Sequence, residues 1–349
     1  MKTVETISWD EADQAVHLID QTRLPGAYRN VRCASVDRLV RAIQRLEVRG
    51  APALGVAGAL GVALAARKIP DKDFRNFSEK LSADAERLRN ARPTAVNLSW
   101  GVDRVMAKAG KGLSVKEVRE LTLSEALAVA EEDARSCHAL GAAGAAILPD
   151  QCTVLTHCNA GALACKEWGT ALGVVRSAVE AGKKVRVIAC ETRPLLQGAR
   201  LTAWELQRDG IDVTVVPDSS AAYLMRLGMI DVVVVGADRV TRDVVFNKIG
   251  TYMHAICAMH HKIPFYVAAP LSTFDPDRTE REVEVEQRGR DEVATFGGVE
   301  TVPHGVPVLN YGFDATPLSL VRGIVTEIGV LAPPLDWDLV VKERERHSP

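Results

Sequence analysis

The segment Leu155–Ala164 (LTHCNAGALA) places a thiol, Cys158, directly after an apolar run. We expect a strand over 153–156, a tight turn over 159–161 and a helix-like segment behind it. A thiol beside the free amides of a helix N-terminus loses its proton more readily, because the positive end of the helix dipole favours the thiolate. The alternative is a buried packing cysteine, which fits the other six cysteines well. We therefore interpret Cys158 as a candidate catalytic residue.

An acid, Asp238, follows four consecutive valines, Val232–Val235, in the stretch VVVVGADR. A half-buried carboxyl group holds its proton more readily than an exposed one, which suits a general acid. The alternative is a salt bridge to Arg239 or to a nearby lysine. We favour proton transfer as the role of Asp238.

Two further clusters carry groups that bind anions. Asn247 and Lys248 stand at the start of an expected helix, where an amide, an ammonium group and the helix dipole can hold one anion together. Gln197 follows the cluster CETRP (190–194), which comes after another apolar run and could grip a polyol or a phosphate. For Glu191 an ion pair with an arginine is the favoured interpretation. Asp218 and the serines after it read first as a helix N-cap.

The first third of the chain adds two arginines beside expected helix starts. In RGAPA (49–53), Pro52 suits the first turn of a helix, so that Arg49 and the amides of Gly50 and Ala51 could face one phosphate. Arg92 precedes another helix start. Each arginine could instead form a salt bridge at a domain interface. Together they predict an anion site between two domains.

Alternating apolar and helical segments after Pro149 predict how these side chains are positioned. Short buried strands are expected at 153–156, 184–189, 213–216, 232–235 and 264–268, with helices near 172–181, 196–208, 219–227 and 248–261. This rhythm is typical of a Rossmann-like, doubly wound parallel sheet. Ligands bind such sheets at the carboxyl ends of the strands, near the switch point. Each polar cluster above, the two arginines aside, falls at or near such an end.

The residues before this sheet indicate a small, mostly helical domain with a short β start. Strands are expected at 6–9, 15–18 and 30–32, and helices at 36–46, 52–66, 72–89, 95–109 and 115–140. Gly55, Gly58 and Gly61 suit close helix packing. We therefore predict an N-terminal helical domain over 1–125 and a Rossmann-like catalytic domain over 126–349, with a linking helix at about 115–147.

Composition excludes several classes of protein. A net charge of -2 without a basic stripe argues against a nucleic-acid partner, and no apolar run reaches the length that spans a membrane. The polar N-terminus argues against a secretion signal. Seven cysteines without a CxxC pair predict reduced thiols in the cytoplasm. No His/Cys spacing predicts a metal site, and no glycine-rich phosphate motif predicts a nucleotide cofactor. The charged stretch 275–292 is expected to be solvated.

Several blocks, taken in order, carry a resemblance to a known family. They are RGAPA (49–53), ARPTAVNL (91–98), THCNAG (156–161), ACETRP (189–194), QGARLTAWEL (197–206), GADRV (236–240), NKIGTY (247–252) and FDATP (313–317). Together they span nearly the whole chain and resemble the methylthioribose-1-phosphate isomerases. The wider family also holds isomerases of ribose 1,5-bisphosphate and 5-deoxyribose 1-phosphate, and non-catalytic subunits of the eukaryotic initiation factor 2B complex.

The resemblance implies an aldose–ketose isomerisation of a sugar phosphate in methionine salvage, by a homodimer that needs no metal or cofactor. Cys158 and Asp238 match the catalytic pair of the family. The substrate-binding positions are matched by Arg49, Gly50, Ala51, Arg92, Gln197, Asn247 and Lys248. The regulatory subunits generally lack the pair, so its presence favours an enzyme. The segment 240–246 departs from the family because it lacks a glycine, and this leaves the choice among the three C1-phosphorylated pentoses open.

Overall fold

The computed structural model describes residues 4–70, 73–93 and 95–347. Lys72, where a helix was expected to begin, and Thr94 of the ARPTAVNL block lie outside these ranges. Within them the chain forms two compact units. The N-terminal unit holds the chain up to His138 together with Gly161–Gly169, and the C-terminal unit holds Ala139–Ala160 and the chain from Thr170 onward. The predicted boundary near residue 125 stays a prediction.

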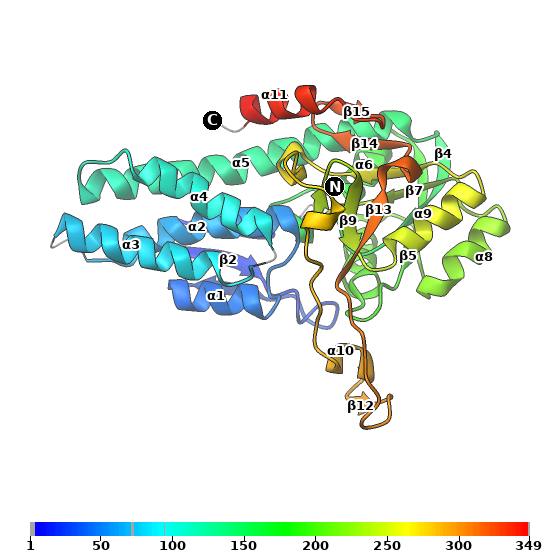
Figure 1. The fold of residues 1–349 in the computed structure, drawn as a ribbon, viewed down its shortest axis with the longest axis horizontal. Coiled ribbons are helices and arrows are strands. Elements are labelled where there is room, and N and C mark those ends of the chain that lie inside the picture. Colours follow the sequence, from blue (N-terminus) through cyan, green and yellow to red (C-terminus); the bar gives the residue numbers. More distant parts are fainter. Residues whose placement is uncertain (1–3, 71–72, 94, 348–349) are drawn as a thin grey trace. The chain divides into compact units, whose positions relative to one another are not determined.

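The N-terminal unit begins with a small antiparallel sheet and continues as helices (Figure 1). Its strands are β1 (Ile7–Asp10), β2 (Ala15–Ile19) and β3 (Asn30–Cys33), and its helices are α1 (Val36–Gln44), α2 (Ala51–Lys68), α3 (Phe74–Arg89), α4 (Val96–Ala109) and the first part of α5 (Val115–Ile147). These elements match the expected ones to within a few residues at most ends.

Helix α2 forms the centre of this unit because it carries almost no polar side chain. Its residues from Ala53 to Ala66 are all buried. It packs closely against α4: a Cβ added at Gly58 would lie 2.5 Å from the carbonyl oxygen of Leu98. The prediction that the spaced glycines of α2 serve close helix packing is therefore confirmed.

The C-terminal unit is built on a seven-stranded sheet of order β15-β14-β10-β7-β4-β5-β6. Its strands are β4 (Gln151–Thr156), β5 (Lys184–Cys190), β6 (Val213–Val216), β7 (Val232–Val235), β10 (Phe265–Ala268), β14 (Gly323–Thr326) and β15 (Gly329–Leu331). All neighbours are parallel except β14 and β15. The predicted doubly wound fold is confirmed, with its five expected strands in place.

Alternate side chains of the strands enter two separate cores, one on each face of the sheet. Val154 and Val187 pack in a core with residues of α5, α6 (Ala171–Glu180) and α7 (Ala203–Asp209). Leu155 and Ile188 pack in the other core with residues of α8 (Ala221–Arg226), α9 (Thr251–His260) and α11 (Trp337–His347). Helices thus cover both faces, which is why most residues of the strands are apolar.

A second, three-stranded sheet of order β13-β9-β8 lies beyond β7 in the chain. It contains β8 (Arg239–Val240), β9 (Val244–Lys248) and β13 (Phe313–Pro317), all antiparallel. The helix expected over 248–261 begins only at Thr251, so Lys248 ends a strand instead of starting a helix. That expectation was wrong because β9 is held by pairing with β13, more than sixty residues later in the chain.

The segment between β10 and β13 also contains the short elements α10 (Asp291–Ala294), β11 (Thr295–Phe296) and β12 (Val299–Glu300) (Figure 1). The charged stretch before them was expected to be solvated. That expectation is wrong for its last residues, because Arg288 and Glu292 form a half-buried ion pair with a shortest distance of 2.6 Å.

Candidate functional site

The order of the large sheet brings the two candidate catalytic residues to its switch point. The chain runs from β4 outward through β5 and β6, then returns to place β7 on the other side of β4. Cys158 follows the end of β4, and Asp238 follows the end of β7. Both therefore leave the sheet at the carboxyl ends of the two strands that flank the reversal, where doubly wound folds bind their ligands.

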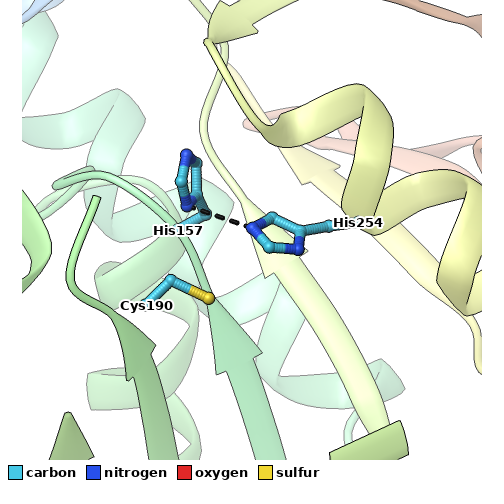
Figure 2. Close-up of side chains that lie close together, drawn as sticks. All are labelled: His157, Cys190 and His254. Carbon is cyan, nitrogen blue, oxygen red and sulfur yellow. Dashed lines mark hydrogen bonds between the residues drawn. The ribbon is translucent and has the colours of Figure 1, made fainter. Parts of the chain in front are cut away.

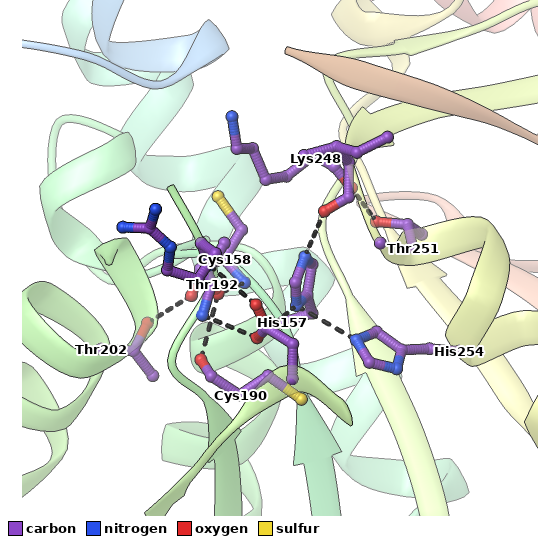
Figure 3. Close-up of polar contacts among 12 residues, drawn as sticks. His157, Cys158, Cys190, Thr192, Thr202, Lys248, Thr251 and His254 are labelled. Carbon is purple, nitrogen blue, oxygen red and sulfur yellow. Dashed lines mark hydrogen bonds and ion pairs between the residues drawn. The ribbon is translucent and has the colours of Figure 1, made fainter. Parts of the chain in front are cut away.

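Cys158 is held in a backbone conformation that non-glycine residues rarely adopt. Its φ is 67°, in the left-handed region. Two threonine hydroxyls hold it there: the Cys158 amide donates to Thr192 Oγ1 at 2.8 Å, and Thr202 Oγ1 donates to the Cys158 carbonyl at 2.7 Å (Figure 3). Such strain persists only where the surroundings enforce it, and it is concentrated at functional sites. The thiol is nearly buried, with 9% of the residue exposed.

The residues after Cys158 do not form the expected helix. Ala162–Ala164 make a single 3₁₀ turn, and α6 begins at Ala171. The helix-dipole argument for the thiolate is therefore wrong. The nearby cationic group is Lys248, and Cys158 acts to raise the pKa of its ammonium group.

The loop after β5 supplies one half of the support for Cys158. Thr192 also has a left-handed φ, of 66°, and its amide donates to Asp218 Oδ1 at 2.7 Å. The Arg193 amide donates to Asp218 Oδ2 at 2.8 Å. Asp218 was expected to cap the helix that follows it. Its carboxylate caps this neighbouring loop instead, and so fixes the hydroxyl that holds Cys158.

Lys248 is a buried cation at the end of β9. Burial lowers the pKa of its ammonium group, and this effect outweighs the opposing influence of Cys158 and Asp238. In Figure 3 the lysine side chain extends from β9 toward the side on which the Cys158 sulfur lies. A desolvated cation attracts an anion more strongly than a solvated one. The structure thus brings Lys248, Cys158 and Asp238 within electrostatic range of one another.

Two buried amide side chains complete the predicted residues of the C-terminal unit. Asn247 Nδ2 donates to Thr251 Oγ1 at 3.0 Å, and Thr251 Oγ1 donates to the Lys248 carbonyl at 2.6 Å. Gln197 is buried, and its Oε1 atom has no hydrogen-bond partner among the residues that the structure describes. A buried acceptor without a partner is costly, and a hydroxyl group of a bound ligand would satisfy it.

Asp314, in the FDATP block, was not among the predicted site residues. Its carboxylate accepts hydrogen bonds from the amides of Gly250 at 2.7 Å and Tyr252 at 3.1 Å, which caps the start of α9. Burial raises its pKa to about 6 in spite of these bonds and of Lys248. Its place in a quoted block was the only sequence signal, because it lies far from α9 in the chain.

His157, Cys190 and His254 form a buried cluster beside Cys158 in the chain fold (Figure 2). One ligand-type atom of each lies within 4.8 Å of the others, a spacing that a metal ion could use. His254 Nε2 stands 3.2 Å from His157 Nδ1, which a hydrogen bond between two neutral rings explains. Burial lowers the pKa of His157 to about 4 and that of His254 to about 3, and it raises the pKa of Cys190.

The remaining predicted residues belong to the N-terminal unit. Gly50 caps α2 with a φ of 90°, and a Cβ there would lie 2.5 Å from the Cα of Ala164. Arg49 Nε donates to Gln21 Oε1 at 3.3 Å. Ala51 begins α2, and Arg92 lies in the turn before α4, half-buried like Arg49. The structure places these four residues at two helix starts, as the sequence predicts.

A doubly wound unit with a thiol and a carboxyl group at its switch point defines the chain as a small-molecule-binding α/β protein of the Rossmann-like class. More narrowly, the chain belongs to the Initiation factor 2 subunit family, whose model matches residues 47–333.

Named relatives within this family carry two kinds of description. A protein of Desulforamulus reducens called methylthioribose-1-phosphate isomerase is 49% identical over 96% of this chain and 98% of its own length. The crystal structure of 5-methylthioribose 1-phosphate isomerase from Pyrococcus horikoshii is 38% identical, with a TM-score of 0.90 over 99% of this chain and 97% of that one. A structure from A. fulgidus, described as translation initiation factor eIF-2B subunit delta, is 51% identical, with a TM-score of 0.87 over 98% of this chain and 99% of that one.

Proposed function

We propose that this protein is an aldose–ketose isomerase that converts 5-methylthio-α-D-ribose 1-phosphate to 5-methylthio-D-ribulose 1-phosphate in methionine salvage. The names of its relatives support the substrate. The observation that carries the proposal is the pairing of Cys158 with Asp238 at the switch point, within the field of the buried Lys248. The left-handed backbone conformation of Cys158 is consistent with a functional role for the thiol.

The proposed reaction starts from a sugar that phosphate at C1 locks in its ring. Asp238 donates a proton to the ring oxygen as the bond from that oxygen to C1 breaks. Cys158 then takes the proton from C2, which gives an enol. C1 gains a proton while the C2 hydroxyl gives its own proton to the Asp238 carboxylate, and this completes the ketose. The rival route moves hydride directly from C2 to C1, while Cys158 assists the hydroxyl proton. Deuterium from heavy water at C1 supports the enol, and full retention of the C2 hydrogen supports the hydride shift.

We assign the phosphate to Arg49, Arg92 and Lys248, with the amides of Gly50 and Ala51, and the sugar hydroxyls to Gln197 and Asn247. The unpaired Oε1 of Gln197 supports its share of this assignment. An apolar surrounding would also discourage loss of the phosphate from the intermediate. We propose no metal or cofactor for these steps.

The second candidate function is that of a non-catalytic, sugar-phosphate-binding regulatory subunit. The description of the A. fulgidus structure as an initiation-factor subunit favours it. The presence of both Cys158 and Asp238 argues for the enzyme.

Turnover separates the candidates. We would assay wild type, Cys158→Ser and Asp238→Asn with methylthioribose 1-phosphate, 5-deoxyribose 1-phosphate and ribose 1,5-bisphosphate. The proposal predicts conversion of the first sugar by wild type, with losses of about 10²–10⁴-fold in each variant, the usual contribution of a general acid–base group. Binding without turnover of any sugar would establish the regulatory function instead. Preference for another of the three sugars would correct the substrate alone.

We also propose that the protein is a cytoplasmic homodimer. All seven cysteines are free thiols, as a reducing compartment requires. Among the described residues no helix is long and apolar enough to cross a membrane. Exposed apolar side chains on and next to α8 and α9, here called the α8–α9 face, support the dimer; they are Tyr223, Leu227, Met229, Tyr252, Met253, Ile256 and Met259. Monomers rarely expose a large patch of this kind.

A further inference from the structure

His157 connects two parts of the candidate site through its ring. It is the residue before Cys158, at the end of β4. Its Nε2 atom lies 2.8 Å from the carbonyl oxygen of Ile249, the residue after Lys248. One imidazole therefore ties the thiol-bearing turn to the end of β9, which bears the cation (Figure 3).

The hydrogen bonds define the tautomer of this ring. A carbonyl oxygen only accepts, so Nε2 must carry the proton that it shares with Ile249. The Nδ1 atom is then an acceptor, and His254 Nε2 donates to it at 3.2 Å. Both rings are neutral in this arrangement, and burial holds the pKa of each well below neutral pH.

The surroundings of the His157 ring hold it in a fixed position and leave it no role in proton transfer. The side chain is fully buried, and a Cβ added at Gly250 would lie 3.1 Å from its Cε1 and Nε2 atoms. The charged or titratable groups that face the pair are Asp218, with Oδ1 3.8 Å from His157 Nδ1, Lys248 and Cys190. A ring enclosed in this way cannot reach a substrate.

We propose that His157 is a positioning residue: its neutral ring joins the Ile249 backbone to the Cys158 turn and so fixes where Lys248 stands relative to the thiol. His254 supports it by donating to Nδ1, which maintains the tautomer. This inference rests on the proposed isomerase function, because the distance between cation and thiol matters for turnover. A shift of about 1 Å between reacting groups can cost about 10²-fold in rate.

The test compares His157→Gln with His157→Phe. The amide nitrogen of glutamine can occupy the place of Nε2 and donate to Ile249, whereas phenylalanine fills the space without a donor. We expect kcat/KM of His157→Gln to stay within about threefold of wild type, and that of His157→Phe to fall by about 10²-fold. Near-wild-type kcat/KM in His157→Phe, or equal losses in both variants, would overturn the proposal.

Two further measurements keep the proposal testable if His157→Phe fails to fold or wild type shows no turnover. His254→Leu removes only the donor to Nδ1, and we expect it to fold and to lose about tenfold in kcat/KM, a smaller effect than loss of the Ile249 bond.

Imidazole ¹⁵N NMR of wild type at pH 7 should show a neutral His157 with its proton on Nε2. A charged ring or the other tautomer would refute the arrangement, whereas absent turnover with this tautomer intact would refute only the isomerase function.

The same atoms offer a competing explanation that the experiment also decides. One ring nitrogen each of His157 and His254 and the Cys190 sulfur have the chemistry of a zinc site. Elemental analysis of the purified wild type and of Cys190→Ala tests this. Stoichiometric zinc in wild type that is lost in Cys190→Ala would overturn the neutral hydrogen-bonded pair, and absence of zinc from both supports it.

Discussion

At the scale of the residue, the position of Cys158 depends on hydroxyl groups that lie far from it in sequence. Thr192 and Thr202 satisfy the amide and the carbonyl of a residue whose own conformation is unfavourable. Thr202 also accepts from Asn159, which in turn donates to the buried Glu205. The position of Cys158 is therefore fixed through its backbone.

The first prediction concerns the hydroxyl of Thr202. Thr202→Val keeps the shape of the side chain but leaves the buried Cys158 carbonyl without this donor, which typically costs about 1–3 kcal/mol. We expect a loss of that size in the free energy of unfolding, together with a loss of about tenfold or more in kcat. Thr202→Ser retains the hydroxyl and serves as the control. Unchanged kcat in Thr202→Val would show that Cys158 keeps its position without the Thr202 hydroxyl.

The second prediction concerns pH and the buried histidine pair. In the folded chain the pKa of His254 is lowered to about 3 and that of His157 to about 4, from 6.5. The folded state therefore stays neutral where the unfolded state gains protons. Stability is full above pH 6.5 and falls as the pH drops toward 4, by at most about 1.4 kcal/mol per pH unit for each histidine.

Urea denaturation at pH 5, 6 and 7 measures this slope. His254→Leu removes one of the two groups, so its stability should fall less steeply with pH than that of wild type. The comparison uses slopes, since the substitution also changes packing. Parallel slopes in the two proteins would contradict the assignment of a neutral buried His254.

At the scale of the element, the start of α2 depends on a close approach that only glycine allows. Gly50 combines a φ of 90° with a Cβ position 2.5 Å from the Cα of Ala164. Gly182 has nearly the same φ, 87°, but no heavy atom within 4 Å of its Cβ position. Comparing Gly182 with Gly50 therefore separates two contributions to the free energy of unfolding: that of the positive φ and that of the steric clash with Ala164.

The third prediction follows from this pair. Gly182→Ala should cost about 1 kcal/mol, the usual penalty for a left-handed residue with a Cβ. Gly50→Ala should cost several times more and should raise KM, because the α2 amides assigned to the phosphate must shift. Thermal unfolding and steady-state kinetics of both variants provide the measurements. Equal destabilisation by the two substitutions would mean that the backbone at Ala164 can move away from the added Cβ at little cost in free energy.

The elements also show what the sequence could and could not predict. Strands β4, β5 and β7 were predictable because strands buried on both faces are continuous apolar runs. The sequence did not predict that Lys248 ends strand β9, because the partner strand β13 follows more than sixty residues later. In the same way, nothing local reveals that Asp218 caps the loop at Thr192 and not its own helix. Local patterns predict elements, whereas pairing between distant segments decides which side chains share a site.

At the scale of the whole molecule, the α8–α9 face is the surface on which we expect a protein partner to bind. Helices α8 and α9 pack together (Figure 1), and methionines and tyrosines on or next to them are exposed. Specific interfaces bury about 800 Å² on each partner, usually around an apolar centre. A second copy of the chain is the partner that we propose.

The fourth prediction tests that partner. Ile256→Glu places a charge in the α8–α9 face and should convert the dimer to a monomer, as measured by light scattering after size-exclusion chromatography. Leu113→Glu changes an exposed leucine of the N-terminal unit and should leave the dimer intact. A wild-type mass of one chain, or a dimer that persists in Ile256→Glu, would rule out this face as the interface.

The short stretch Gly161–Gly169 constrains when the N-terminal unit can fold during synthesis of the chain. It belongs to the N-terminal unit, although the residues on both sides of it belong to the other. Thr6 bonds to Lys166 and Ala162, Gln21 to Leu163, and the Lys166 amide to Asp133. On the ribosome, the N-terminal unit therefore cannot finish folding when its own last helix emerges. It must wait until the first strand of the other unit and this stretch have left the exit tunnel, and during that interval its apolar surface stays open, a condition that favours aggregation.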